Sequence, residues 1–347
     1  MSSFIGYTPC QILSGYSLNQ IKFPNNQMPG HGVNIVIIIP YSNPNLQNDL
    51  NQFCLTYNII PPILNIVSVK PNTPSNSEWI TESCIDTQWI SAIAPGATIT
   101  VVQAFSSDVS DLFDAINLAE NLNPDIISMS WGFEEFNGIQ NKQYFNKNNI
   151  IYLAASGDSN NIQYPSSNPN VISVSATNLY LNSNCSYNTE IAWQDSGCGF
   201  SSYFLIPNYQ SNNIPNITSQ FRSSSDLSIQ GGNQTGCVIY DSTASGLTTG
   251  AGTSVSTPIM AGIFGLVVQL RNNKNKQKLG SAVSNGKYCV QNILYSTLKN
   301  INIYNNIFND ITQGSSGIYQ TTVGYDNPTG LGTPKGLEFV EFLSTCL

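Results

Sequence analysis

The sequence contains few charged side chains and only one histidine. Asp, Glu, Lys and Arg make up 9% of its 347 residues, and 12 basic against 20 acidic residues give a formal net charge of −8. Surfaces that bind nucleic acids or anionic membranes need many Lys and Arg residues, so neither partner is expected. The polar surface must consist mainly of amides and hydroxyls, which lose little when carboxylates are protonated, and this fits an acidic environment.

Several familiar sequence signals are also missing. Residues 1–6 lack the basic region and long apolar stretch of a signal peptide. The sequence does not give the compartment, although a secreted or acidic one is favoured. No apolar run is expected to span a membrane. The eight cysteines include no Cys-x-x-Cys pair and no Cys/His cluster, so no zinc site is expected. Cys185 could pair with Cys198 or Cys237, but the sequence does not assign disulfides, and all eight thiols could be reduced.

Short apolar runs alternate with amphipathic segments along the first half of the chain. The expected strands are 32–39, 63–69, 97–104, 125–130, 149–155 and 171–176, and the expected helices are 46–57, 77–94 and 109–121. This alternation predicts an α/β fold with a doubly wound, mostly parallel sheet and helices on both faces. Residues 179–249 read as loops, and the tail reads as a loop until a short helix at 336–343. No repeat or linker is evident, so residues 1–347 are expected to form a single domain.

The stretch from Gly250 to Pro258 precedes an apolar run that is expected to form a central helix. Pro258 suits the first turn of that helix, and Thr257 or Ser256 can cap it. Ser254 then lies near unpaired backbone N–H groups, which suit an anionic tetrahedral intermediate. A capping role is the simpler interpretation of a lone serine, but the flanking glycines allow close approach of another chain and favour a nucleophile.

A serine nucleophile needs a base, and the single histidine does not supply one. His31 precedes the first expected strand, at the sheet end opposite the carboxyl ends where ligands gather, so an ordinary Ser-His-Asp triad is excluded. Glu82 and Asp86 are four residues apart on one helix face, among apolar and aromatic neighbours. If they are buried, they share a proton and can relay it in acid. A solvated helix face is an equally weighted interpretation.

Three further aspartates fall in turns. Asp158 follows a strand in a Ser-Gly-Asp turn, where it is either a turn-forming residue or, when protonated, a donor to an oxyanion. Asp310 and Asp326 flank a segment rich in Gly, Ser and Thr. Two carboxylates with loop carbonyls are ligands that calcium uses, but ordinary turn acids would look the same.

Taken in order, these pieces resemble the sedolisins, the serine-carboxyl peptidases, whose fold is subtilisin-like. The resemblance covers nearly the whole chain and rests on motifs at 7–12, 82–97, 128–132, 155–159, 252–258, 310–311 and 324–332. The nucleophile motif reads Gly-Thr-Ser-Val-Ser-Thr-Pro, and the oxyanion motif reads Ala-Ser-Gly-Asp-Ser. Subtilisins share the first of these, but their histidine motif is absent here.

The resemblance implies a role for each catalytic candidate. Ser254 attacks the scissile carbonyl, and Glu82 takes its proton and later passes one to the leaving amine. Asp86 orients Glu82 and shares the proton, while Asp158 stabilises the oxyanion together with the backbone N–H of Ser254. The segment Ser130, Trp131 and Gly132 lines the substrate cleft.

The resemblance also implies one Ca²⁺ ion. Its ligands are the side chains of Asp310 and Asp326 and the carbonyls of Ile311, Thr322 and Gly324. Thr322 stands where the family usually has glycine, but only a carbonyl is needed there.

From the resemblance we expect an acid-active endopeptidase that hydrolyses polypeptides. We expect the protein to be a monomer. A carboxylate base works best in acid. A tripeptidyl exopeptidase of the same family and an inactive protease-like binding or structural protein are the alternatives. Two departures bear on them: Ile38-Ile39-Pro40 replaces an acidic residue that extends the carboxyl network in some relatives, and the family's N-terminal propeptide is not visible.

Overall fold

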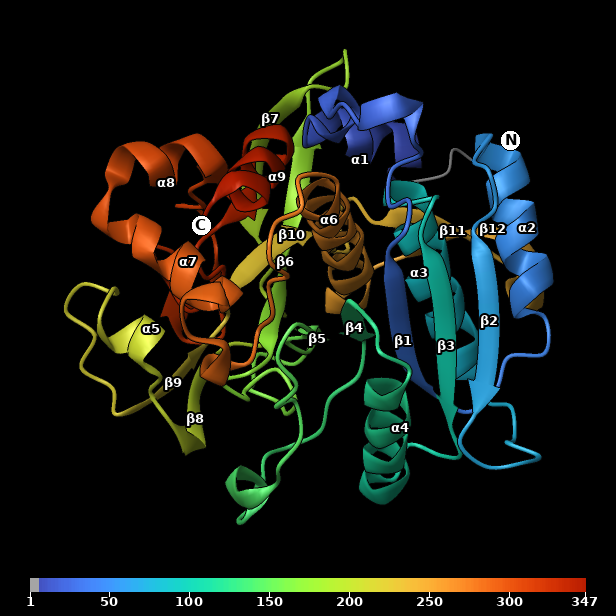
Figure 1. The fold of residues 1–347 in the computed structure, drawn as a ribbon, viewed down its shortest axis with the longest axis horizontal. Helices are drawn as coiled ribbons and strands as arrows, with labels where there is room; N and C mark the ends of the chain where they lie inside the picture. The colour runs from blue at the N-terminus through green and yellow to red at the C-terminus, as the bar shows by residue number, and fades with distance from the viewer. Residues whose placement is uncertain (1–5) are drawn as a thin grey trace.

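The computed structural model describes residues 6–347, so the first five residues of the stretch in which no signal peptide was expected lie outside it. Its centre is an eight-stranded sheet (Figure 1). Seven strands run parallel in the order β10-β6-β5-β4-β1-β3-β2, and β7 pairs antiparallel with β6. These strands are β1 (Asn34–Pro40), β2 (Ile63–Ser68), β3 (Thr98–Ala104), β4 (Ile126–Met129), β5 (Ile151–Ala155), β6 (Ile172–Leu181), β7 (Tyr187–Ala192) and β10 (Leu227–Gln230).

Helices cover both faces of this sheet. Alternate residues of β1 enter two separate apolar clusters, because successive side chains of a strand point to opposite faces. Ile35 and Ile37 join the cluster that holds α2 (Leu46–Tyr57), α3 (Ser77–Ile93), α6 (Thr253–Asn273) and α9 (Gly336–Thr345). Val36 and Ile38 join the cluster built with α4 (Val109–Asn121). The doubly wound, mostly parallel α/β architecture predicted from the sequence is confirmed.

The predicted start of the central helix is wrong. Helix α6 begins at Thr253 rather than near Ser256, so Pro258 is its sixth residue and lies inside the helix. A proline there has no N–H for the carbonyl four residues earlier, which belongs to Ser254. The Ser130 hydroxyl lies 3.4 Å from that carbonyl oxygen, but its proton goes to Asp86 Oδ1, at 2.5 Å. The interior proline therefore leaves the Ser254 carbonyl without its usual helical donor.

The same helix bears on the expectation that no apolar run could span a membrane. By length and composition α6 could cross a membrane, but 94% of its most apolar window is buried inside the structure. Figure 1 shows it at the centre of the molecule, packed between the sheet and the C-terminal helices. Its apolar character on all sides is explained by this central position.

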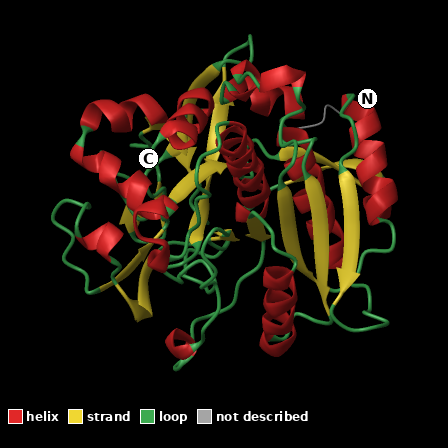
Figure 2. Cartoon of the chain, in the orientation of Figure 1, coloured by secondary structure: helices red, strands yellow, loops and turns green. Residues whose placement is uncertain are grey.

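The region 179–249 is not a series of loops, as the sequence suggested. Besides β7 and β10 it forms β8 (Gly199–Leu205), β9 (Phe221–Ser224), β11 (Cys237–Asp241), β12 (Gly246–Gly250) and the short helix α5 (Asn208–Ser211), visible as yellow and red segments in Figure 2. The remaining α-helices of the described residues are α1 (Pro9–Gly15), α7 (Val290–Ser296) and α8 (Ile301–Ile307). Strands of four to seven residues, several of them rich in Ser, Thr or Gly, carry too little apolar periodicity to be recognised.

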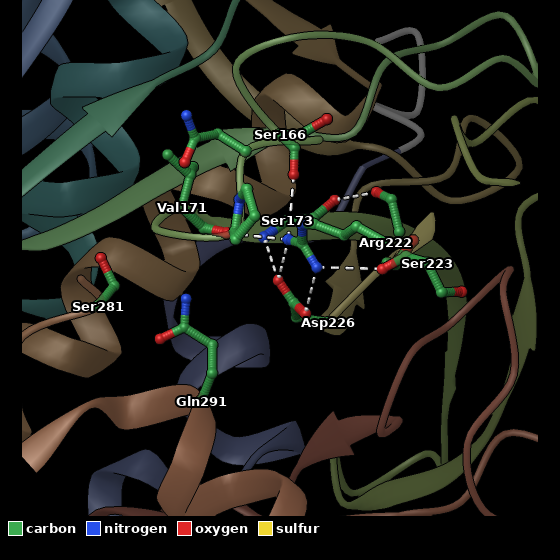
Figure 3. A network of polar contacts seen from close by, with 12 residues as sticks. Ser166, Val171, Ser173, Arg222, Ser223, Asp226, Ser281 and Gln291 are labelled. Atoms are coloured by element: carbon green, nitrogen blue, oxygen red, sulfur yellow. Dashed lines mark hydrogen bonds and ion pairs between the residues drawn. The ribbon is translucent and has the colours of Figure 1, made fainter. Parts of the chain in front are cut away.

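A buried ion pair fastens this region to the sheet (Figure 3). Arg222 of β9 contacts Asp226 at 2.7 Å, and both side chains are almost fully buried. The guanidinium also donates to the carbonyls of Ser166 and Val171, and Asp226 accepts from the backbone N–H of Ser173 at the start of β6. Because a buried charge is costly unless paired and hydrogen-bonded, this network fixes the loop against the strand.

Candidate active site

Helix α3 carries the predicted carboxyl pair to the middle of the molecule. It is capped by the Asn76 side chain, which accepts a hydrogen bond from the backbone N–H of Glu78, and from Ser83 to Ile93 it is completely buried. The helix packs along α6, which carries Ser254. Glu82 and Asp86 therefore face α6 from one helix face, and the solvated-face interpretation is wrong for Asp86, whose exposed fraction is zero. Glu82 stays partly exposed.

The two carboxyls perturb each other. Burial raises the pKa of Glu82 well above its usual range, and the neighbouring Asp86 raises it further. Burial likewise raises the pKa of Asp86, against an opposing hydrogen bond from Ser130. Ser130 Oγ donates to Asp86 Oδ1 at 2.5 Å. Glu82 Oε1 and Asp86 Oδ2 have no hydrogen-bond partner among the described residues. One proton on the pair would supply a missing donor and remove the repulsion.

Ser254 lies in the first turn of α6, beside this pair. Its hydroxyl lowers the pKa of Glu82, as a donor to the carboxylate does, and the Ser130 hydroxyl has a smaller effect in the same direction. The Ser254 hydroxyl and the Glu82 carboxyl therefore lie within reach of each other. Catalytic hydrogen bonds are often long before substrate binds, so this geometry suits a nucleophile and its base.

Asp158 sits just beyond β5, against the start of α6. Its Oδ1 accepts from the backbone N–H of Thr253 at 2.9 Å and from the Thr253 hydroxyl at 2.7 Å. Desolvation by surrounding protein atoms raises its pKa, while the bonds from Thr253 oppose this. The residue as a whole remains exposed to solvent. With Oδ1 held as an acceptor, a proton on this carboxyl is carried by Oδ2, which is free to donate.

Two glycines make room for this arrangement. Gly252 has φ of +113°, and a Cβ built there would lie 2.5 Å from Asp158 Oδ2. A Cβ on Gly231 would lie 2.2 Å from the Ser256 hydroxyl and 2.5 Å from the carbonyl oxygen of Gly252. Gly252, one of the glycines that favoured a nucleophile in the sequence, is thus required by the close approach of Asp158, whereas Gly231 was not recognised there.

The expected cleft segment is only partly available to a substrate. Trp131 is 4% exposed, packs in the α4-side cluster and donates from Nε1 to the carbonyl of Ile38 at 3.0 Å. Its side chain therefore belongs to the core, and Ser130 is committed to Asp86. A Cβ on Gly132 would lie 2.6 Å from Gln163 Oε1. Backbone groups of 130–132, rather than the indole, are what this segment can offer a peptide.

Four of the five predicted calcium residues contact one another in two pairs, Gly324 with Asp310 and Thr322 with Asp326. Gly324 N–H donates to both carboxyl oxygens of Asp310, and Asp326 accepts from the backbone N–H groups of Thr322 and Thr329. The Tyr304 hydroxyl faces three acceptors, on Asp310, Gly324 and Leu331, at 3.1 to 3.3 Å. A single hydroxyl donates one proton, so acceptor oxygens are in excess, and this donor set fits a hard cation.

Three contributors were not recognised from the sequence. Thr253 ties Asp158 to the helix start, Tyr304 gathers the oxygens of the C-terminal loop, and Ser130 binds Asp86 instead of only lining a cleft. Hydroxyl residues are abundant here, so only their spatial partners distinguish these three. His31 is exposed in the turn before β1, as expected, and all eight cysteines are free.

Comparison with known proteins agrees with this geometry. A model of the subtilase family matches residues 23–319. The chain belongs to the subtilase family. Within it, the chain is 26% identical to kumamolisin of Bacillus sp. (strain MN-32) over 97% of its own length and 63% of the relative's. It is 31% identical to tripeptidyl-peptidase sed4 of Aspergillus fumigatus over 46% of its length and 30% of that protein.

A solved structure supports the fold. Pseudomonas sedolisin, a serine-carboxyl proteinase complexed with two molecules of pseudo-iodotyrostatin, superposes with a TM-score of 0.82 at 21% identity, covering 99% of this chain and 100% of that one. The architecture is therefore that of a subtilisin-like peptidase. The chain spans less than two thirds of the length of kumamolisin.

Proposed function

We propose that this chain is a serine-carboxyl peptidase that hydrolyses internal peptide bonds of polypeptides in acid. The observation that carries the proposal is the convergence of one hydroxyl and three carboxyls with raised pKa values, those of Glu82, Asp86 and Asp158, around the start of α6. Structural ion-pair networks also perturb pKa values, but these carboxyls form no ion pair with the Lys and Arg residues of the described chain.

The proposed reaction is an acyl transfer through Ser254. As the Ser254 oxygen bonds to the scissile carbonyl carbon, its proton passes to Glu82, and the carbonyl oxygen becomes an oxyanion. Protonated Asp158 and the Ser254 backbone N–H donate to that oxyanion. The proton on Glu82 goes to the leaving amine, and water then hydrolyses the acyl-enzyme by the same steps. Asp86, held by Ser130, keeps Glu82 oriented and shares its proton.

We also propose that the C-terminal loop binds one Ca²⁺ ion through Asp310, Asp326 and the carbonyls of Ile311, Thr322 and Gly324. The excess of acceptors around Tyr304 supports this, as does the raised pKa of Asp326. The ion would hold the loop by charge neutralisation, away from the reacting groups.

Hydrolysis of a denatured protein in acid tests the proposal. Ser254→Ala is expected to lower kcat by about 10⁴-fold or more, because the nucleophile acts as a unit with its base. Ser256→Ala is the matched control. Ser256 lies two residues after Ser254 in the same helix, and its hydroxyl donates to the carbonyl of Ile229. Cleavage by Ser254→Ala at the wild-type rate would refute the assignment. If the wild-type protein neither cleaves the substrate nor is labelled by a peptide aldehyde in acid, the protein is inactive.

A tripeptidyl exopeptidase is the second candidate, because one relative carries that name. The two activities differ in whether the substrate needs a free amino terminus. Peptides of equal sequence with acetylated and free N-termini separate them: an endopeptidase cleaves both at similar rates, whereas a tripeptidyl peptidase cleaves only the free form.

A further inference from the structure

A second polar cluster lies on the opposite side of α3 from the proposed active site. It consists of Asp49 on α2, Cys84 on α3 and Asp241 at the end of β11. One ligand atom from each lies within 4.8 Å of the others, and all three residues are buried. The three residues belong to elements far apart in sequence. A search for Cys-x-x-Cys pairs or Cys/His clusters in the sequence therefore cannot find them.

No Lys or Arg of the described residues pairs with the carboxylates of this cluster, and one carboxylate oxygen lacks a donor. Asp49 is 0% exposed, and its carboxyl points into the cluster, with Oδ2 3.7 Å from Cys84 Sγ. Its Oδ1 has no hydrogen-bond partner in the described part of the chain. Neither Asp49 nor Asp241 takes part in any of the three ion pairs formed by residues 6–347. Buried carboxylates are normally hydrogen-bonded, paired with a cation or bound to a metal, and Asp49 Oδ1 has no such partner among the described residues.

Neighbouring groups already hold the three side chains in place. Thr81 Oγ1 donates to Asp241 Oδ2 at 2.6 Å, and the backbone N–H of Thr243 donates to Oδ1 at 2.8 Å. Asn43 Nδ2 lies 3.7 Å from Cys84 Sγ. Such outer contacts orient metal ligands and are part of a built site. The exposed Ser242, whose hydroxyl lies 3.1 Å from Asp49 Oδ2, marks a short path to solvent.

We propose that Asp49, Cys84 and Asp241 form a Zn²⁺ site, with the Ser242 hydroxyl or a water as fourth ligand. One sulfur and two carboxylate oxygens suit zinc, which accepts both, better than calcium or magnesium, which take oxygen alone. Zinc bonds of about 2.0 to 2.3 Å require ligand atoms about 3 to 4 Å apart, which the Cys84–Asp49 contact already meets.

Binding is coupled to a proton. Burial and the two neighbouring carboxyls raise the pKa of the Cys84 thiol, so the metal-free cysteine is protonated. When the sulfur bonds to zinc, that proton leaves to solvent, and affinity falls as the pH is lowered. The ion would join α2, α3 and β11, and would thereby stiffen the helix that carries Glu82 and Asp86. This site is independent of the proposed peptidase activity.

Metal content after treatment with EDTA and reloading with one equivalent of Zn²⁺ at neutral pH tests the proposal. Wild type is expected to retain one zinc per chain. Cys84→Ala and Asp49→Asn are expected to bind at least about tenfold more weakly, because each removes a ligand. Co²⁺ is the spectroscopic probe: wild type should show a thiolate-to-metal charge-transfer band that Cys84→Ser, which keeps the packing, lacks.

Two variants control for other sites. Cys54→Ala removes a buried free cysteine that lies on α2 and outside the cluster. Asp310→Ala removes a ligand of the proposed calcium loop. Both should keep one zinc and the cobalt band. Failure of wild type to retain zinc, or equal retention and an unchanged band in Cys84→Ala and Cys84→Ser, would overturn the proposal.

Discussion

Asp158 has two oxygens with different surroundings. Oδ1 accepts from the Thr253 backbone and hydroxyl, so it acts as a cap for α6, which begins at Thr253. Oδ2 faces Gly252 and is free to carry a proton. The structural role of Asp158 and its proposed oxyanion role are therefore compatible, because each uses a different oxygen of the carboxyl.

Asp158→Asn is expected to keep both roles, because its amide oxygen can accept from Thr253 while its NH₂ group donates at every pH. Asp158→Ala loses both, and should lower kcat by about 10²- to 10³-fold and the free energy of unfolding by about 1 kcal/mol. In wild type, Asp158 stops donating as the pH rises through its raised pKa, so the pH profile of kcat/KM for Asp158→Asn should extend further toward neutral. An asparagine variant as inactive as the alanine variant would exclude the donor role.

At the scale of elements, the junction between β12 and α6 brings α6 within reach of Asp158. Gly252 adopts φ of +113°, which only glycine takes up easily, and its missing Cβ is the space that Asp158 occupies. The entry to the helix and the position of the proposed oxyanion donor are thus one structural feature.

Gly252→Ala is expected to lower the free energy of unfolding by about 1 to 2 kcal/mol through backbone strain and to abolish most activity by displacing Asp158. Gly32→Ala is the control, since Gly32 also has positive φ, at +75°, but a Cβ there meets nothing within 4 Å. It should lose similar stability and keep its activity. Urea unfolding and kcat/KM measure the two effects, and full activity in Gly252→Ala would show that Asp158 does not need this position.

Elements with strong apolar periodicity could be predicted from the sequence. Elements whose ends depend on contacts with residues distant in sequence could not. Helices α2 and α4 match their predicted bounds, because leucines and phenylalanines recur on one face. The start of α6 was misplaced because Pro258 usually marks a first turn, and only Asp158, from a distant strand, satisfies the earlier N–H group. Glu82, Asp86 and Ser254 could be brought together only through the ordered resemblance, whereas Thr253 and Tyr304 needed the coordinates.

At the scale of the molecule, desolvation favours the protonated form of several carboxyls. Desolvation raises the pKa of Glu82, Asp86, Asp158, Glu190 and Asp326. Between the unfolded values near 4 and these raised values, the folded chain binds more protons than the unfolded chain, so stability increases as the pH falls.

The free energy of unfolding is therefore expected to be higher at about pH 5 than at about pH 7.5 in EDTA. Below about pH 4 it should decrease, because the pKa of Asp111 is lowered by its hydrogen bond to Lys70, and protonation removes that contact. Urea unfolding of Ser254→Ala, a variant that avoids self-digestion, measures the free energy of unfolding in both pH ranges. A steady loss of stability from pH 7.5 to pH 5 would contradict the expectation.

Calcium should reverse part of this pH dependence. Burial raises the pKa of Asp326 to about 7, and the nearby Asp310 contributes. Since Ca²⁺ binds the ionised carboxyl, its affinity should fall by up to about tenfold per pH unit below 7, and Ca²⁺ should raise Tm more at pH 7.5 than at pH 5. Asp326→Asn should lose this shift, whereas Asp114→Asn, a change at an exposed carboxyl of α4, should keep it. An equal Tm shift in both variants would place the ion elsewhere, because only Asp326 belongs to the loop in which acceptor oxygens exceed donors.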